Sequence, residues 1–249
     1  MSLTGLPWTT LVDVPRLAAA LVGPSVQVLD ARATASTAVR VVDARFSLAD
    51  PQSGAAQYAA GHIAGALHAD LNRDLSDLGR QGHGRHPLPD SDTFAATLGR
   101  WGMSQVPEVT ALGPYPGRFD MAQVVSADEV QARLAQRPGW LVDARAAERY
   151  RGDVEPLDRV AGHVPGALNR PFGMNVHEGR LRPAAELQAE LGALLGDQPA
   201  RETVLMCGSG VTACHLLLAF EHAGLAGARV FADSWSGWSS DPSRPVAVG

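Results

Sequence analysis

The sequence predicts an α/β fold in which one unit of parallel strands and flanking helices occurs twice. The tripeptide Asp-Ala-Arg ends an apolar run at residues 43–45 and again at residues 143–145, and each run is typical of a buried parallel strand. A Gly-His turn follows 19 residues after Asp43 and 20 residues after Asp143, in "AGHIAGALH" and "AGHVPGALN". Because order and spacing agree, we infer a duplicated unit of about 120 residues, an ordinary domain size.

The second copy predicts its elements in regular order. Ser126 and Glu129 predict a capping box that opens a helix over residues 127–136, and a strand follows at residues 140–143. A helix is predicted at 184–195, a strand at 203–206, a third helix at 212–223 and a last strand at 228–232. Strands that alternate with helices indicate a mostly parallel sheet with helices on both faces.

The first copy is shorter than the second. Cys207 lies 44 residues after His163, and the matching point in the first copy is Val106, close before the second copy opens at Ser126. The strand, helix and strand that follow Cys207 therefore have no room there. We predict an incomplete domain over residues 1–120, ending in a Gly- and Pro-rich linker, and a complete domain over residues 121–249. The extra segment "VQVLDAR" at 26–32 is expected to pair at the first sheet's edge.

Composition excludes several classes of partner. The chain has 21 Lys and Arg against 26 Asp and Glu, a net charge of −5, and its arginines are dispersed, so we expect no nucleic-acid partner. No leader pattern opens the sequence and no stretch approaches 18 apolar residues, so we expect no membrane contact. The two cysteines, Cys207 and Cys214, lie too close together to tie distant segments, which favours a cytoplasmic, reducing location.

The segment "VLMCGSGVTACH" at residues 204–215 places Cys207 between a strand and a helix. Such a turn aims backbone amides at one point, and the helix dipole adds positive potential there. Gly208 and Gly210 suit this turn because they leave the amides uncovered, and Thr212 is a predicted N-cap. Cys207 is thus expected to be a nucleophile near neutral pH. The alternative is a buried cysteine at a strand end.

Several residues near these motifs are predicted to have no part in the chemistry. Cys214 lies inside the third predicted helix and is expected to pack there, with a resolving thiol as the alternative. His83 and His86, in "GHGRHPLP", lack a third metal ligand, so we interpret them as loop residues and expect neither a metal nor another cofactor. Ala213 stands six positions after Cys207, where a cysteine phosphatase needs an arginine, which argues against phosphoryl chemistry.

Five motifs together resemble one family. They are "GHIAGALH", "VDARAAERYRGDVEP", "GHVPGALNRPF", "CGSGVT" and "SWSGWSSDPSRPV". With them the sequence resembles the tandem-rhodanese sulfurtransferases, and its loop without charged residues resembles that of the 3-mercaptopyruvate type. The resemblance implies two rhodanese-like domains, of which the first, truncated here, is non-catalytic and the second is catalytic. The active-site loop it implies consists of Cys207, Gly208, Ser209, Gly210, Val211 and Thr212.

The resemblance also implies a reaction. Cys207 would take a sulfur atom from 3-mercaptopyruvate as a persulfide, release pyruvate, and pass the sulfur to a thiol or cyanide acceptor, such as a thioredoxin-like protein. Two alternatives stay open. Thiosulfate could be the sulfur donor, or the chain could be a sulfur-carrier or interaction module whose turnover is impaired because the first domain is incomplete.

The remaining site residues follow from the same resemblance. Ser209 matches a serine used near the leaving group, although it could equally hold the loop by a backbone hydrogen bond. Arg149 matches an arginine that binds the substrate carboxylate; a solvated surface arginine is the alternative. A second arginine of the family would stand nine residues after Arg149. This sequence has Asp158 there, so we take the neighbouring Arg159 as the candidate. His62 matches an assisting histidine, or is structural like its twin in the second copy.

Overall fold

The computed structural model describes residues 10–22, 40–103, 119–136 and 138–249. The chain divides into two compact units: Met1–Asp77 with Leu88–Phe119, and Leu78–Pro87 with Asp120–Gly249. Residues 78–87, which we expected in the first domain, therefore belong to the second unit. The predicted extra strand at 26–32 and most of the linker, residues 104–118, lie outside the described residues.

The second unit is built on a four-stranded parallel sheet. Its order is β4-β3-β7-β8, with β3 at Leu141–Asp143, β4 at Leu168–Asn169, β7 at Val204–Met206 and β8 at Arg229–Val230. Every residue of β3 and β7 is buried, which explains why these segments are apolar without alternation. The carboxyl ends of the two central strands lie side by side, because Asp143 pairs in register with Met206.

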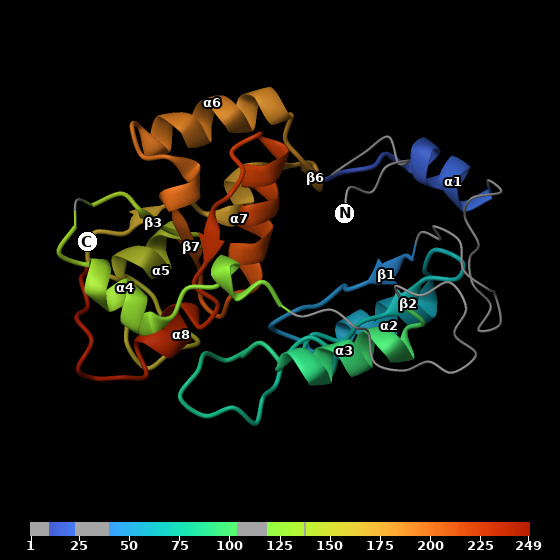
Figure 1. The fold of residues 1–249 in the computed structure, drawn as a ribbon, viewed down its shortest axis with the longest axis horizontal. Helices are drawn as coiled ribbons and strands as arrows, with labels where there is room; N and C mark the ends of the chain where they lie inside the picture. Colours follow the sequence, from blue (N-terminus) through green and yellow to red (C-terminus); the bar gives the residue numbers. More distant parts are fainter. Residues whose placement is uncertain (1–9, 23–39, 104–118, 137) are drawn as a thin grey trace. The chain divides into compact units, whose positions relative to one another are not determined.

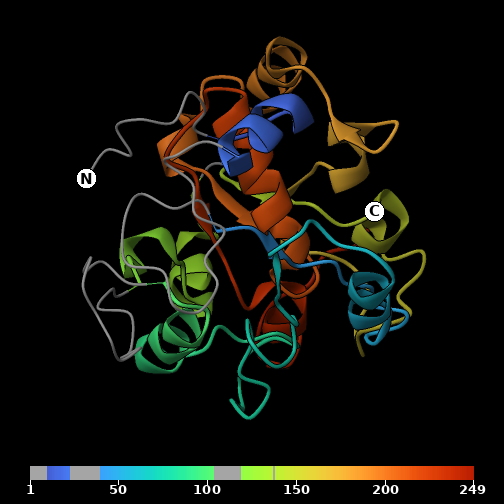
Figure 2. The same ribbon diagram turned by 90° about the vertical axis from the view of Figure 1, so that its right-hand side faces the viewer.

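Helices cover both faces of this sheet (Figure 1, Figure 2). On one face, α6 (Ala184–Leu195) and α7 (Val211–His222) bury a core that includes Leu187, Leu205 and Phe220. On the other face, α4 (Ala127–Arg133), α5 (Ala147–Arg151) and α8 (Ser234–Trp238) lie over a second core. The sequence thus predicted the α/β class and the parallel sheet correctly.

Shorter elements complete the second unit. They are the 3-10 helices η1 (Met121–Gln123), η2 (Phe172–Asn175) and η3 (Ala200–Glu202), and an antiparallel hairpin of β5 (Val176–His177) and β6 (Arg180–Leu181). The predicted capping box forms only in part. Ser126 Oγ accepts a hydrogen bond from the Glu129 amide at 3.2 Å, but the Glu129 carboxylate pairs with Arg229 at 2.8 Å.

The first unit holds fewer described elements. Its helices are α1 (Val14–Val22), α2 (Ser53–Ala60) and α3 (Ser91–Arg100), and its sheet pairs β1 (Val42–Asp43) with β2 (Leu67–His68) in parallel. This pair repeats β3 and β4 of the second unit, where Asp143 and Asn169 are in register as Asp43 and His68 are here.

The two Gly-His turns have the same internal contacts. In the first unit, His62 stacks on Tyr58 with ring centroids 3.9 Å apart, and its Nδ1 lies 2.8 Å from the Tyr58 carbonyl. In the second unit, His163 stacks on Tyr150 at 3.8 Å, and its Nδ1 lies 2.8 Å from the Tyr150 carbonyl. Identical contacts in both copies show that each histidine fastens its own turn.

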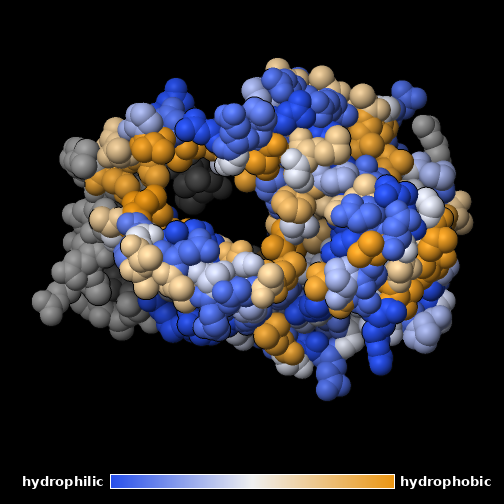
Figure 3. All heavy atoms as spheres, turned by 180° about the vertical axis from the view of Figure 1, so that it is seen from behind, coloured by the Kyte–Doolittle hydropathy of each residue, from blue (hydrophilic) through white to orange (hydrophobic). Residues whose placement is uncertain are grey.

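Hydrophilic and hydrophobic side chains are intermixed over the face of the molecule in Figure 3. Within the described part of the chain, no helix is both long enough and apolar enough to cross a lipid bilayer.

Candidate active site

The loop after β7 holds Cys207 with its side chain turned into the protein, and only 2% of the residue is exposed. The short helix α8 holds this loop through three hydrogen bonds. The Cys207 amide donates to Ser234 Oγ at 3.1 Å, while the Cys207 and Gly208 carbonyls accept from the amides of Trp235 (3.0 Å) and Ser236 (2.9 Å). The "SWSGW" motif therefore clamps the loop, and its two tryptophans, which are fully buried, close the core.

Backbone N–H groups gather beside the cysteine. Among the described residues, the amides of residues 208–212 have no acceptor, in contrast to that of Cys207. Gly210 has φ +90° and is the N-cap of α7, so the helix begins at Val211 and the predicted N-cap role of Thr212 is wrong. Only glycine suits this position, because a β-carbon on Gly210 would lie 2.6 Å from the Ala232 carbonyl oxygen. The loop is thus built to stabilise an anion.

A serine and a histidine form a polar pair next to Cys207. Ser209 Oγ lies 2.9 Å from Nδ1 of His86, a residue 123 positions earlier in the chain. Ser209 is buried, and burial, with the nearby charge of Arg85, lowers the pKa of His86. His86 does lie in a loop, as we interpreted it, but the structure gives it a polar partner, Ser209. His62, which the resemblance matched to an assisting histidine, lies in the turn of the first unit described above.

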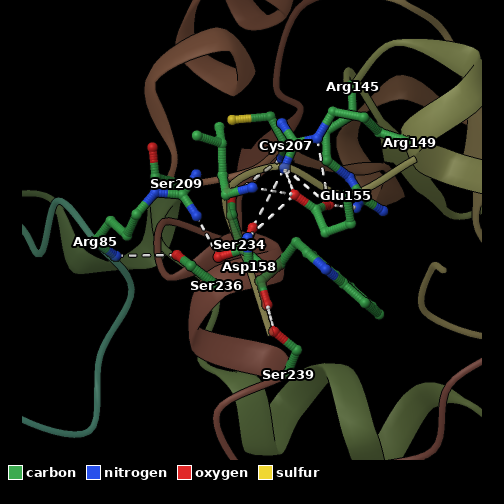
Figure 4. A network of polar contacts seen from close by, with 12 residues as sticks. Arg85, Arg145, Arg149, Glu155, Asp158, Cys207, Ser209, Ser234, Ser236 and Ser239 are labelled. Atoms are coloured by element: carbon green, nitrogen blue, oxygen red, sulfur yellow. Dashed lines mark hydrogen bonds and ion pairs between the residues drawn. The ribbon is translucent and has the colours of Figure 1, made fainter. Parts of the chain in front are cut away.

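Two arginines and two carboxylates form a cluster beside the same loop (Figure 4). Arg149 Nη2 donates to Glu155 Oε1 at 2.7 Å and to Asp158 Oδ2 at 3.2 Å, and Arg149 Nε donates to Glu155 Oε2 at 3.2 Å. Arg85 Nη1 pairs with the other oxygen of Asp158, and the Arg85 amide donates to Ser236 Oγ at 2.9 Å. Asp158 thus holds both guanidinium groups.

The electrostatics of this cluster favour the ionised form of Glu155. Burial alone would raise the pKa of Glu155, but hydrogen bonds from Arg149 and from the amides of Leu157 and Asp158 outweigh it and lower that pKa. Arg159, our second candidate for the substrate, is exposed and has no polar partner within the described chain. The second arginine of the cluster is Arg85.

A second ion pair supports the site at the end of β3. Arg145 and Asp143 are both buried and share several hydrogen bonds, one of 2.6 Å from Arg145 Nη2 to Asp143 Oδ2. The Arg145 guanidinium also donates to the Gly162 carbonyl at 2.7 Å and lies over the Trp235 ring. The repeated Asp-Ala-Arg motif is therefore structural: its arginine ties the end of a strand to the Gly-His turn.

The other cysteine and histidine candidates have different surroundings. Both cysteines are free thiols, and Cys214 is exposed, so its expected packing role is wrong. Neighbouring atoms shield the Cys214 thiol from solvent, and this shielding raises its pKa. The charge of Cys207 raises it further. His83 pairs with Asp233 at 3.0 Å. Within the described ranges, no three His, Cys, Asp or Glu side chains form a group that could hold a metal ion.

A parallel α/β sheet that presents a cysteine in a loop of backbone amides defines a rhodanese-like domain, and the model of that domain matches residues 126–241. The chain belongs to the rhodanese family of sulfurtransferases, and within it to the tandem type that includes the 3-mercaptopyruvate enzymes. It is a sulfurtransferase of α/β fold, as the sequence motifs predicted.

Three relatives illustrate the similarity. A protein of Pseudomonas aeruginosa named "Probable 3-mercaptopyruvate sulfurtransferase" is 39% identical over 261 residues, covering 84% of this chain and 92% of its own length. SseB of Mycobacterium tuberculosis, whose name assigns it to the thiosulfate sulfurtransferases, is 37% identical over 262 residues, covering 85% of this chain and 91% of its own. The crystal structure of the 3-mercaptopyruvate enzyme SseA from Escherichia coli matches with a TM-score of 0.69 at 25% identity, covering 92% of this chain and 100% of that one.

Sequence reasoning missed Arg85 and His86, although one feature pointed to their segment. From the Gly-His turn to the next helix, the first copy runs 29 residues from His62 to Ser91, whereas the second runs 21 from His163 to Ala184. The surplus falls in a stretch rich in Arg, His and Gly. A polar segment without a counterpart in the other copy is a candidate for function, because the repeated framework does not need it.

Proposed function

We propose that this sulfurtransferase uses 3-mercaptopyruvate as its sulfur donor and Cys207 as the sulfur-accepting nucleophile. The observation that carries this proposal is the position of Arg149: a β-carbon placed on Gly208 would lie 3.4 Å from Arg149 Nη1. A guanidinium suited to a carboxylate therefore lies one residue from the nucleophile. The relatives named for this donor support the same substrate.

The reaction balances within the site. The Cys207 thiolate attacks the donor sulfur, a new S–S bond forms, and the bond from that sulfur to the donor methylene breaks with its electron pair left on carbon. The persulfide loses the proton of the former donor thiol, and the carbon gains one proton to become the methyl group of pyruvate. The net change is one sulfur atom to Cys207 and one proton from sulfur to carbon, with no external oxidant or reductant.

Ser209 and His86 are placed to carry that proton. Their contact at 2.9 Å joins a hydroxyl to an imidazole whose pKa is lowered by burial, which favours the neutral form. A neutral imidazole can take the persulfide proton through Ser209 and return it to the enolate carbon. The resulting persulfide anion would lie against the amides of residues 208–212, which have no other acceptor among the described residues. A thiol acceptor then attacks the outer sulfur and restores the Cys207 thiolate.

Pyruvate release tests the donor. The protein is incubated with 3-mercaptopyruvate and dithiothreitol, and pyruvate is measured; thiosulfate is tried in parallel. Faster turnover with thiosulfate would favour the thiosulfate reaction, for which SseB of M. tuberculosis is named. No pyruvate from a folded protein would overturn the 3-mercaptopyruvate proposal.

Intact mass spectrometry tests the nucleophile with a matched pair of variants. Exposure to donor without acceptor should add one sulfur atom to the wild type and to Cys214→Ser, but none to Cys207→Ser. If Cys207 takes up sulfur but small thiols do not support turnover, the chain would be the sulfur carrier described above, which needs a partner protein. The length of the alignment supports this alternative. The alignment with the P. aeruginosa protein spans 261 positions, whereas this chain has 249 residues, so some positions of the relative have no counterpart in this chain.

The acceptor and the location are part of the same proposal. An anionic persulfide suits a small thiol, cyanide or a thioredoxin-like protein as acceptor. Two free thiols that form no disulfide favour a reducing cytoplasm. Recovery of the protein in a cell fraction other than the cytoplasm would count against this location.

A further inference from the structure

The segment of residues 78–87 carries His86 to the active-site loop without any helix or strand of its own. Its residues lie in turns, bends and irregular structure, yet His86 Nδ1 lies 2.9 Å from Ser209 Oγ. Proton transfer between two side chains depends on the distance between their heavy atoms, so both backbones must be held in place. Other parts of the second unit therefore have to fix the backbone of this segment.

Ser236 of α8 contacts the chain immediately before each member of this pair. Its Oγ accepts a hydrogen bond from the Arg85 amide at 2.9 Å (Figure 4), and Arg85 precedes His86. Its own amide donates to the Gly208 carbonyl at 2.9 Å, and Gly208 precedes Ser209. One residue thus sets the backbone of the histidine and the backbone of the serine relative to each other.

The segment also packs closely on the start of α8. His83 Nδ1 lies 3.0 Å from Asp233 Oδ1. A β-carbon on Gly84 would clash with the Asp233 carbonyl oxygen and would lie 2.9 Å from Ser236 Oγ, so the close approach of the two backbones needs a glycine. The start of α8 is therefore the surface on which residues 83–85 lie.

We propose that Ser236 is a positioning residue for sulfur transfer, whose hydroxyl holds His86 at the distance from Ser209 that proton transfer needs. This inference rests on the proposed function, which assigns the proton to Ser209 and His86, and it adds a residue that acts through them. Asp158 pairs with the side chain of Arg85. The amide of Arg85, and with it the backbone next to His86, is held by Ser236.

The kinetics of two hydroxyl variants test the proposal. Ser236→Ala removes the acceptor of the Arg85 amide but keeps the amide of residue 236, so the hydrogen bond to Gly208 remains. We expect kcat with 3-mercaptopyruvate to fall about tenfold or more, because a small misplacement of reacting groups can cost about 100-fold. Ser236→Thr keeps an acceptor hydroxyl and should retain most of the wild-type kcat. A threonine variant as slow as the alanine variant would overturn the role of the hydroxyl.

A second serine at the end of α8 provides the control. Ser239 Oγ donates to the Trp235 carbonyl at 2.7 Å, a hydrogen bond local to this helix, and Ser239 is half-buried as Ser236 is. Ser239→Ala therefore removes a hydroxyl of similar burial and should leave kcat unchanged. Equal losses of kcat in the two alanine variants would overturn the proposal, because they would reflect the stability of α8 alone.

A double-variant cycle shows whether Ser236 acts through His86. In a protein that already carries His86→Ala, the further change Ser236→Ala should lower kcat no more, because the imidazole that Ser236 positions is absent. A full additional loss would show that Ser236 acts on the loop independently of His86, and it would overturn the proposal.

The titration of His86, followed by NMR, gives a readout that needs no turnover. Burial, and after it the charge of Arg85, lowers the pKa of this imidazole, so release of the segment should move the pKa up toward its ordinary value. We expect that rise in Ser236→Ala and none in Ser239→Ala. Both variants keep the charged residues beside the segment, which include Arg85, Asp158 and Asp233.

The same titration separates this inference from the proposed function. An unmoved pKa of His86 in Ser236→Ala would overturn the positioning role, whatever the wild-type protein does with 3-mercaptopyruvate. A raised pKa in Ser236→Ala, together with no release of pyruvate by the wild type, would refute the proposed function and support the hold of Ser236 on His86.

Discussion

His86 Nδ1 lies 2.9 Å from Ser209 Oγ, although 123 residues separate the two along the chain. Within the second unit, this contact joins the segment of residues 78–87 to the loop that follows β7. Burial and the charge of Arg85 lower the pKa of the His86 imidazole, which favours its neutral form. We expect His86→Ala and Ser209→Ala each to lower kcat about 100-fold or more. The double variant should lose little beyond either single variant, since both act on one proton; additive losses would separate their roles.

The pH dependence of kcat follows from the same pKa. The pKa of His86 is lowered below its ordinary value of 6.5, mainly by burial, so kcat should fall only as pH drops through that lowered value. Arg85 contributes to that lowering. Arg85→Gln should therefore raise the pKa of His86 and move the acid limb of the kcat profile to higher pH, measured at saturating donor. An unmoved acid limb would show that another group controls it.

Two glycines of the loop should respond differently to alanine. Gly208→Ala places a methyl group against the flexible ends of Arg85 and Arg149, so the protein should fold normally but bind pyruvate more weakly. Gly210→Ala combines φ +90° with a contact of 2.6 Å to a backbone oxygen, so it should destabilise the second unit itself. Urea unfolding and pyruvate titration of both variants check this. A stable, fully binding Gly210→Ala would contradict the strain argument.

The duplicated Asp-Ala-Arg motif supplies a matched pair for a test of burial. Arg145→Met leaves Asp143 buried without its counter-ion, which should cost about 3 to 5 kcal/mol of unfolding free energy. Arg45→Met removes the corresponding partner of Asp43, but the Arg45 side chain is 41% exposed, so the effect should be much smaller because water solvates the charges. Tryptophan fluorescence can follow both units, since Trp140, Trp235 and Trp238 lie in the core of the second and Trp101 caps α3 in the first. Equal losses would contradict the role of burial.

Two variants of Ser234 should separate the effect of backbone strain on stability from that of hydrogen bonding. It has φ +52°, which disfavours a side chain, yet its Oγ accepts from the Cys207 amide and donates to the Phe231 carbonyl. Ser234→Ala keeps the strain and loses both hydrogen bonds, for a cost of about 1 to 3 kcal/mol. Ser234→Gly loses the same bonds but relieves the strain, so it should be the more stable variant. The reverse order in thermal unfolding would show that the strain is negligible.

The sequence by itself determined the parts of this protein that depend on neighbours along the chain. Apolar runs indicated β3 and β7, and helix α6 begins and ends at the residues predicted for it. The loop from Cys207 to Thr212 could be identified because a strand, glycines and a helix follow one another directly. Thr212 was misplaced as the N-cap because Gly210 adopts a left-handed conformation that no side chain signals.

Only the tertiary structure decided which distant side chains surround that loop. Hydrophobic periodicity records which face of an element is buried, but it carries no information about a partner more than a hundred residues away. Residues 78–87 have no such period, so nothing in them revealed that Arg85 would pair with Asp158 or that His86 would contact Ser209. The ion pair of Arg85 with Asp158 exists only in three dimensions. It becomes visible where the folded chain brings the two residues together.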